Sequence, residues 1–412
     1  MKIKTIINCI FATIILLYTQ EVYAESSLLD LYNSFVEGLP AVQSYSLKAQ
    51  ALNFDTEGLS RSRFFNPTVS TVYSNYQSPD LRQFSIADLT LSNNIDIFNK
   101  LSVDINKNKL EIEKNKILKN IAKRIIFTSI LDAYSSLVKN KYLLKVNKQS
   151  LEEIDKHIKI IKKCNEEGTL PDTELINWNI ARLNLINEIE NYKLEIFKAE
   201  ETLKLHSKLK EIATEEIDLK KITAKEYPEI SEEEFIKNSP EIASLNIDQK
   251  QLKLDIKKIK ISPLPNLQIS DTLEYNQDPT SYGNRNIAVA AMNFVLPNGT
   301  GKPRIKSLDN KIKGIDQDKE AQIMALKTIF RAKMREMDSQ KFMLTNLDEA
   351  KCLSGKKLER LKIAYQKKLI SYIVIATAIK DNELIQENYV AALANLNQNY
   401  EYLYHLSKGD IY

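Results

Sequence analysis

The clearest pattern in the chain is a heptad spacing of seam positions near its C-terminal end. Between about Ser371 and Ser407 the steps alternate between three and four residues, which is the spacing that packs one helix against another. The positions are Ile375, Ala378, Asn382, Ile385, Tyr389, Ala392, Leu396, Asn399, Leu403 and Leu406. About 200 residues earlier the same spacing occurs at Leu175, Trp178, Arg182, Leu185, Ile189, Tyr192, Ile196, Ala199, Leu203 and His206. A pattern that occurs twice predicts a tandem duplication.

The first repeat is predicted to contain a broken helix, two strands, a very long helix and a returning helix. Residues 27–63 have a helical pattern with a break allowed at Pro40, and at Pro67 the period changes to two. In the first strand Val69, Thr71 and Tyr73 alternate with Ser70, Val72 and Ser74; in the second, Leu89, Leu91, Ile95 and Ile97 alternate with Thr90, Ser92, Asn94 and Asp96. From Leu101 to about Glu167 a helical pattern runs for nearly 70 residues, or about 100 Å. Gly168 is expected to end this helix.

The second repeat follows the same order. Ser239-Pro240 matches Leu39-Pro40 and begins a helix that is expected to reach Ile261. Apolar Leu267, Ile269, Leu273 and Tyr275 then alternate with Gln268, Ser270, Thr272 and Glu274, and residues 287–296 are expected to form the partner strand. The second long helix is predicted over 302–366. We therefore expect a signal peptide at 1–24, a first repeat at 25–208, a linker at 209–234 and a second repeat at 235–412. The charged linker could equally be a solvated segment without such a role.

The first 24 residues have the pattern of a secretory signal peptide. Lys2 and Lys4 provide a basic start, residues 6–18 an apolar core, and residues 22–24 (Val-Tyr-Ala) a small-residue cleavage site. The apolar core is too short for a spanning helix, although an uncleaved N-terminal anchor is the alternative. We expect an unlipidated mature protein that begins at Glu25 and has no membrane-spanning helix.

Composition and candidate chemistry argue against an enzyme or a nucleic-acid-binding protein. Charged residues make up 27% of the chain but the net charge is only +4, so no strong field toward nucleic acid is implied. Cys164 and Cys352 are expected about 18 Å apart along the helix axis, too far for a disulfide, so both should be reduced. His157, His206 and His405 lie on predicted helices without partner ligands at metal spacing. We expect no metal, no cofactor and no catalytic activity.

The predicted strands suggest a membrane channel. Strands of about ten residues, with one apolar and one polar face, match spans through an outer membrane. Four strands cannot close into a barrel, and open edges cannot exist in lipid, so several copies would have to combine to at least eight strands. The alternative is a soluble hairpin that caps a coiled coil.

The layout resembles the TolC-like outer-membrane efflux family. The family's repeat has one proline near the start of a helix and another before the first strand; here these are Pro40 and Pro67, and Pro240 and Pro265. Its hairpin tips have the form Gly-x-x-[Ser/Thr]-x-x-Asp, and the corresponding tips here are Gly168-Thr169-Leu170-Pro171-Asp172-Thr173-Glu174 and Lys368-Leu369-Ile370-Ser371-Tyr372-Ile373-Val374. The resemblance implies a mainly α fold with a β-barrel part. It also implies a homotrimer with a twelve-stranded barrel in the outer membrane and a periplasmic helical tunnel. An adaptor protein and an inner-membrane pump would be its partners.

The resemblance also points to candidate site residues at the tips. Asp172 and Glu174 would line the tunnel entrance, and a carboxylate ring there would give weak cation selectivity; the alternative is that Glu174 is one more solvated charge. Adaptor contact is expected at Gly168, Thr169, Lys368 and Ser371. Val374 replaces the acidic residue in the second repeat, and Lys368 replaces the tip glycine.

A further departure concerns the bend between strand and long helix. The family often has Phe-x-Gly-Gly there, whereas the first repeat has Ile97-Phe98-Asn99-Lys100, without glycine. The second repeat keeps two glycines, Gly299 and Gly301. How the first repeat makes this bend is therefore an open question at the level of sequence.

Two functions from different classes fit these observations. The first is an outer-membrane exit duct of a tripartite efflux or type I secretion system, which passively passes small molecules or proteins from the periplasm to the exterior. The second is a periplasmic coiled-coil adaptor or spacer without a pore. The paired strands favour the duct, because an adaptor needs small barrel domains with Gly-rich turns and none is evident.

Overall fold

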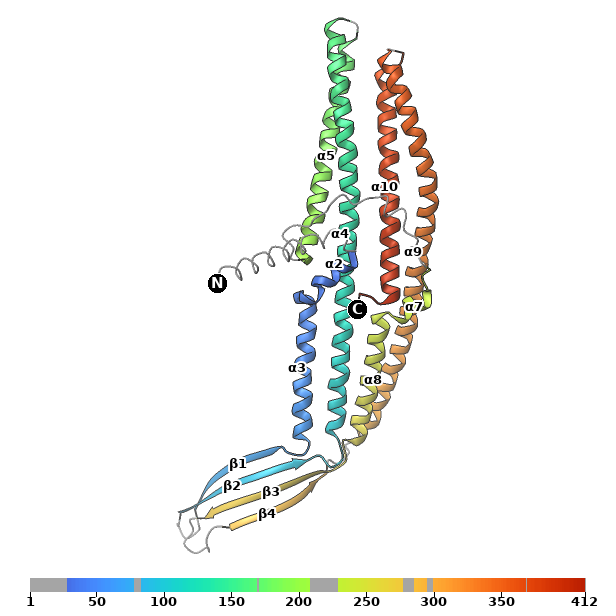
Figure 1. Cartoon of the computed structure of the whole chain (residues 1–412). Helices are drawn as coiled ribbons and strands as arrows, with labels where there is room; N and C mark the ends of the chain where they lie inside the picture. Colours follow the sequence, from blue (N-terminus) through green and yellow to red (C-terminus); the bar gives the residue numbers. More distant parts are fainter. Residues whose placement is uncertain are drawn as a thin grey trace, which may run out of the picture. The chain divides into compact units, whose positions relative to one another are not determined.

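The computed structural model describes residues 28–77, 83–168, 170–207, 229–276, 285–294, 299–367 and 369–411. This part of the chain is mostly helical with one antiparallel sheet, and the same order of elements occurs twice (Figure 1). The first half contains α2 (Leu28–Phe35), η2 (Val36–Gly38), α3 (Pro40–Ser62), β1 (Pro67–Gln77), β2 (Gln83–Ile95), α4 (Leu101–Glu166) and α5 (Asp172–Ser207). The second half contains α7 (Glu232–Lys237), α8 (Pro240–Ile261), β3 (Asn266–Asn276), β4 (Arg285–Asn293), α9 (Gly301–Gln366) and α10 (Tyr372–Lys408).

The chain forms two compact units, and each unit takes segments from both halves of the sequence. One unit contains residues 43–121 and 240–324; the other contains 1–42, 122–239 and 325–412. The two long helices, α4 and α9, have 66 residues each, close to the predicted 101–167 and 302–366, and each contributes residues to both units. Most of the predicted linker at 209–234 lies outside the described residues.

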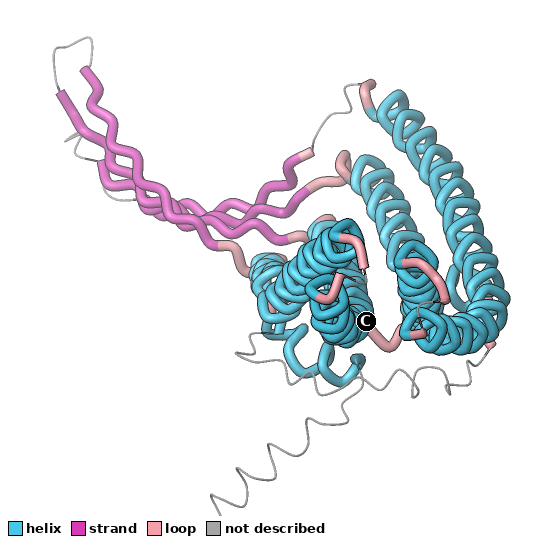
Figure 2. Tube along the Cα trace, turned by 90° about the horizontal axis from the view of Figure 1, so that it is seen from above, coloured by secondary structure: helices cyan, strands magenta, loops and turns pink. Residues whose placement is uncertain are grey.

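The four strands form one sheet, which is magenta in Figure 2. Their order is β1-β2-β3-β4, and every neighbouring pair is antiparallel (Figure 1). The register has no interruption in any of the three pairs. Residues that pair directly point to the same face, and successive residues alternate between faces. Hydroxyl pairs confirm this: Thr68 Oγ1 lies 2.6 Å from Ser92 Oγ, and Thr90 Oγ1 lies 3.0 Å from Thr272 Oγ1.

One face of the sheet is apolar, as the alternation predicts, and it is open to the surroundings. Eight of its large side chains expose between 44% and 68% of their area: Val69, Tyr73, Leu89, Leu91, Ile269, Leu273, Tyr275 and Met292. Ile95 and Leu267, which pair with each other at one end of this face, are half-buried. The edge strand β4 departs from the pattern. Ile287 pairs with Thr272 and Val289 pairs with Ser270, so these two apolar side chains lie on the polar face.

The bend between β2 and α4 answers the question that the missing glycines raised. Asn99 has φ = 61°, and Gly299, 200 positions later, has φ = 78°. Asparagine is among the few non-glycine residues that adopt this left-handed conformation readily. The alternation predicts Asp96 and Ile97 as strand, but they lie beyond the end of β2. Asp96 caps α4 instead, because its carboxylate accepts hydrogen bonds from the backbone N–H groups of Lys100 (2.8 Å) and Leu101 (2.7 Å).

Ion pairs connect the helices of the same unit. Lys107 and Lys114 on α4 pair with Asp255 and Asp248 on α8 at 2.7 Å, and Lys258 on α8 pairs with Asp104 on α4 at 2.6 Å. These groups are partly exposed, so each pair contributes at most about 1 kcal/mol. Their register aligns α8 against the N-terminal part of α4.

The other unit contains two helical hairpins whose packing faces are the predicted heptad seams. The described seam positions of α5 and α10 are all buried or half-buried, and Trp178, Leu203, Ile375 and Leu403 are at most 2% exposed. The side chain of His206 lies outside the described residues. A core cluster of Ile154, Ile161, Trp178, Leu185, Ile189 and Ile375 joins α4, α5 and α10, so residues of both hairpins pack together.

Candidate tunnel-entrance site at the hairpin tips

The first tip turns at Gly168. This residue has φ = 70°, and its N–H donates to Asn165 O at 2.8 Å, so α4 ends as the sequence predicts. The Asn165 side chain donates to Leu170 O (3.2 Å) and to Asp172 Oδ1 (2.7 Å). Asp172 is exposed and is held by its own hairpin. Thr169 lies outside the described residues.

The second tip ends where α10 begins. Ser371 occupies the N-cap position, as predicted, with φ = −82° and ψ = 164°. Its side chain makes no capping hydrogen bond, but its carbonyl oxygen accepts from Val374 N at 3.2 Å. Lys368 lies outside the described residues.

Glu174 connects the two tips. Its Oε2 accepts a hydrogen bond from the Tyr365 hydroxyl at 3.1 Å, and its Oε1 accepts from the Tyr372 backbone N–H at 3.3 Å. Tyr365 lies in the last turn of α9 and Tyr372 is the first residue of α10, so both donors belong to the second hairpin. The carboxylate is half-buried. It is therefore not simply a solvated charge of the first hairpin.

Aromatic side chains surround this contact. The Trp178 indole N–H donates to the Tyr365 hydroxyl at 3.0 Å, and the Tyr372 hydroxyl donates to Asn177 O at 3.0 Å. The His157 ring stacks on Trp178 with the ring centroids 5.1 Å apart. The sequence indicated Trp178 only as a packing residue and gave no role to Tyr365 or Tyr372.

The protonation of the cluster follows from its burial. Burial raises the pKa of Tyr365 to about 12, with the Glu174 charge acting in the same direction and the bond from Trp178 against it. Burial lowers the pKa of His157, and the nearby Lys362 lowers it further. At neutral pH Tyr365 is therefore a hydroxyl donor and His157 is uncharged. A cavity of about 400 Å³ lies beside them, lined in part by Cys164 and Ile370.

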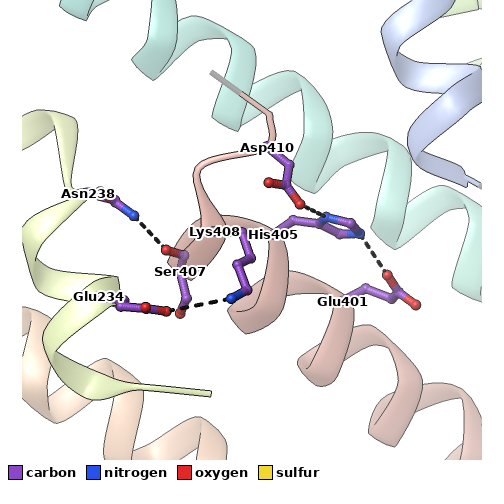
Figure 3. A network of polar contacts seen from close by, with 7 residues as sticks. All are labelled: Glu234, Asn238, Glu401, His405, Ser407, Lys408 and Asp410. Carbon is purple, nitrogen blue, oxygen red and sulfur yellow. Dashed lines mark hydrogen bonds and ion pairs between the residues drawn. The ribbon is translucent and has the colours of Figure 1, made fainter. Parts of the chain in front are cut away.

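A second polar cluster lies at the other end of α10 (Figure 3). His405 is buried, with Nε2 at 2.9 Å from Glu401 Oε2 and Nδ1 at 3.4 Å from Asp410 Oδ2. The Asn238 side chain donates to Ser407 O at 2.6 Å. These contacts fix the end of α10 to α7 and to the residues that follow. Among the described residues no three His, Cys, Asp or Glu side chains form a group that could hold a metal ion, and Cys164 and Cys352 are both reduced, as predicted.

The fold is that of the TolC-like outer-membrane channels, as the sequence pattern predicts. The open-state outer membrane channel MtrE of Neisseria gonorrhoeae matches with a TM-score of 0.78 at 10% identity, over 93% of this chain and 89% of that one. The outer membrane protein VceC of Vibrio cholerae matches with a TM-score of 0.74 at 12% identity, over 94% and 97% of the two chains. The outer membrane channel CmeC of Campylobacter jejuni matches with a TM-score of 0.73 at 14% identity, over 93% and 84%.

Comparisons of sequence alone find no relative. No protein-family model matches the chain, and no curated protein matches it. Over the described residues, no helix combines the length and the apolar character needed to cross a membrane. The likeness therefore rests on the arrangement of helices and strands in space.

Proposed function

We propose that this protein is the outer-membrane exit duct of an export system and that it works as a homotrimer. The observation that carries the proposal is the open four-stranded sheet, whose apolar face is uncovered. That face contains Leu91, Leu273 and other side chains more than two-fifths exposed, which is costly in water and favourable against lipid. The fold shared with known outer-membrane channels supports the same function.

The sheet cannot close on itself. In the described structure β1 and β4 each pair on one side only, and unpaired backbone groups are strongly unfavourable in lipid. Pairing of β4 with β1 of a neighbouring copy would satisfy both edges. Three copies with four strands each would give a twelve-stranded barrel with a water-filled interior.

The unit that contains the two helical hairpins has a second apolar stripe, and this stripe supports contact between copies. On α5, away from the buried seam, several large apolar side chains recur at helical spacing and are 50–58% exposed: Ile176, Ile180, Leu183, Leu194 and Phe197. A stripe of this kind predicts another helix packed against it. In a trimer, helices of the adjacent protomer would cover it and complete a tunnel wall.

The proposed duct is passive. The energy would come from an inner-membrane pump, reached through a periplasmic adaptor at the hairpin tips, where Gly168, Thr169, Lys368 and Ser371 are the candidate contacts. Asp172 and Glu174 would lie at the tunnel entrance, with Glu174 holding the second hairpin to the first. Residues 1–24 would be the signal peptide that directs export of the chain from the cytoplasm, followed by two repeats, 25–208 and 235–412, joined by a linker at 209–234.

Extraction and conductance test this function. We expect the protein in the outer-membrane fraction, released by detergent as a particle of three times the chain mass. In a planar bilayer it should give discrete conductance steps. A monomer that is freely soluble in buffer and gives no conductance would instead indicate a periplasmic adaptor or spacer, and would refute the duct.

A further inference from the structure

All charged side chains on the polar face of the sheet lie in a single row, within the strand residues that the structure describes. Asp88 on β2 pairs with Glu274 on β3, and Glu274 pairs with Arg285 on β4. On β1 the same row ends at Val72. The rest of this face carries hydroxyl and amide groups, at Thr68, Ser70, Ser74, Thr90, Ser92, Asn94, Gln268, Ser270 and Thr272, together with a few apolar residues.

The row is electrostatically unbalanced. Asp88 and Glu274 are direct cross-strand neighbours, and like charges in that position repel each other. Arg285 is the direct neighbour of Glu274 but lies two strands, or about 10 Å, from Asp88. Each chain therefore contributes two carboxylates and one guanidinium, a net charge of −1.

Asp88 provides a second observation on the charge balance of this row. Its Oδ1 atom is buried and has no hydrogen-bond partner among the described residues. A buried carboxylate oxygen without a donor is unfavourable. Any cation that approaches the polar face at this level would relieve both the unsatisfied oxygen and the repulsion from Glu274.

We propose that Asp88, Glu274 and Arg285 form a charged ring inside the barrel that makes the duct prefer cationic over anionic solutes. The proposal rests on the proposed function, since three copies are needed to close the ring, with a net charge of −3. Rings of acidic side chains give cation preference in other pores. The screening length is about 10 Å at 0.1 M salt and about 30 Å at 0.01 M, so the preference should strengthen as salt is diluted.

The reversal potential of the reconstituted trimer, measured across a KCl gradient at low salt, tests the ring. Wild type should favour K⁺ over Cl⁻. In the double variant D88N/E274Q the ring charge changes from −3 to +3, so the preference should turn toward Cl⁻. In Arg285→Gln the ring charge becomes −6, so the K⁺ preference should increase. Because these changes have opposite signs, impaired folding cannot produce both.

The control is Asp271→Asn, which removes the same kind of charge from the same strand. Asp271 pairs with Leu91 and Ala288 and so lies on the apolar face, and its neutralisation should leave the reversal potential unchanged.

Glu174→Gln distinguishes an effect of the ring from an effect of the tip carboxylates. If D88N/E274Q conducts with a wild-type reversal potential, or if Glu174→Gln alone abolishes the K⁺ preference, the ring is refuted while the duct stands. If wild type forms no channel, the proposed function fails and the ring fails with it.

Discussion

Replacing Tyr365 by phenylalanine should release the two hairpin tips from each other. The change removes one oxygen atom that takes part in two hydrogen bonds, one to Glu174 at 3.1 Å and one from Trp178 at 3.0 Å. Trp178 is only 1% exposed, so an indole N–H without its partner costs about 1–3 kcal/mol. Glu174 is half-buried and water can replace part of the lost donor, which adds about 1 kcal/mol.

The sum is about 3 kcal/mol, which corresponds to about a 100-fold increase in the population of separated tips. Trp178 is the only tryptophan in the chain, so its fluorescence reports directly on this contact. We expect a red-shifted emission and stronger quenching by acrylamide in Tyr365→Phe. In a planar bilayer the variant should spend a larger fraction of time in the open state.

Tyr372→Phe is the matched control. It removes a hydroxyl that donates to Asn177 O on an exposed surface, but it leaves the Tyr372 backbone N–H on Glu174 and keeps the aromatic ring against Trp178. In Tyr372→Phe the acrylamide quenching of Trp178 fluorescence and the fraction of time that the channel is open should stay close to wild type. If Tyr365→Phe behaves like Tyr372→Phe in both measurements, Glu174 does not hold the tips together.

Three further predictions concern pH, the bend before α4 and the apolar face of the sheet. The pKa of Tyr365 is raised to about 12 from an ordinary value of 10, so the Tyr365 hydroxyl loses its proton at a lower pH when the tips are separated than when they are in contact. The contact should therefore weaken between about pH 10 and 12 and be unaffected below. Acrylamide quenching of Trp178 fluorescence should rise in this pH range in wild type but not in Tyr365→Phe. Asn99→Ala should destabilise the protein by about 1 kcal/mol because residue 99 has a positive φ, whereas Asn99→Gly should not. Thermal unfolding followed by circular dichroism measures both effects. Asp271→Leu should raise the free energy of unfolding of the protein in liposomes by about 1 kcal/mol or more if the apolar face meets lipid, which a higher denaturant midpoint will show. An unchanged midpoint would contradict that placement.

Periodic patterns of hydrophobic residues predict most of this fold. The seams through Trp178 and Ile375 repeat over ten positions each, and a register of that length specifies which face of α5 and of α10 is buried. Strand alternation likewise predicts which face of β1, β2 and β3 is apolar. It fails at the end of β2, because alternation continues through Asp96 although the carboxylate caps a helix there. A local capping interaction does not disturb the period, so the period cannot reveal it.

The contact at the tips is a different kind of feature. Glu174 and Tyr365 are 191 positions apart, and their pairing depends on how far α9 extends before the second hairpin turns. The first repeat supplies the carboxylate, and the second, which has Val374 at the corresponding position, supplies the donors from Tyr365 and Tyr372. The absence of an acid in the second repeat, which looked like a lost half of a symmetric site, is consistent with a site divided between the repeats. One carboxylate from the first half of the chain binds a hydroxyl and a backbone N–H from the second half, so the contact at the tips needs different residues from the two halves.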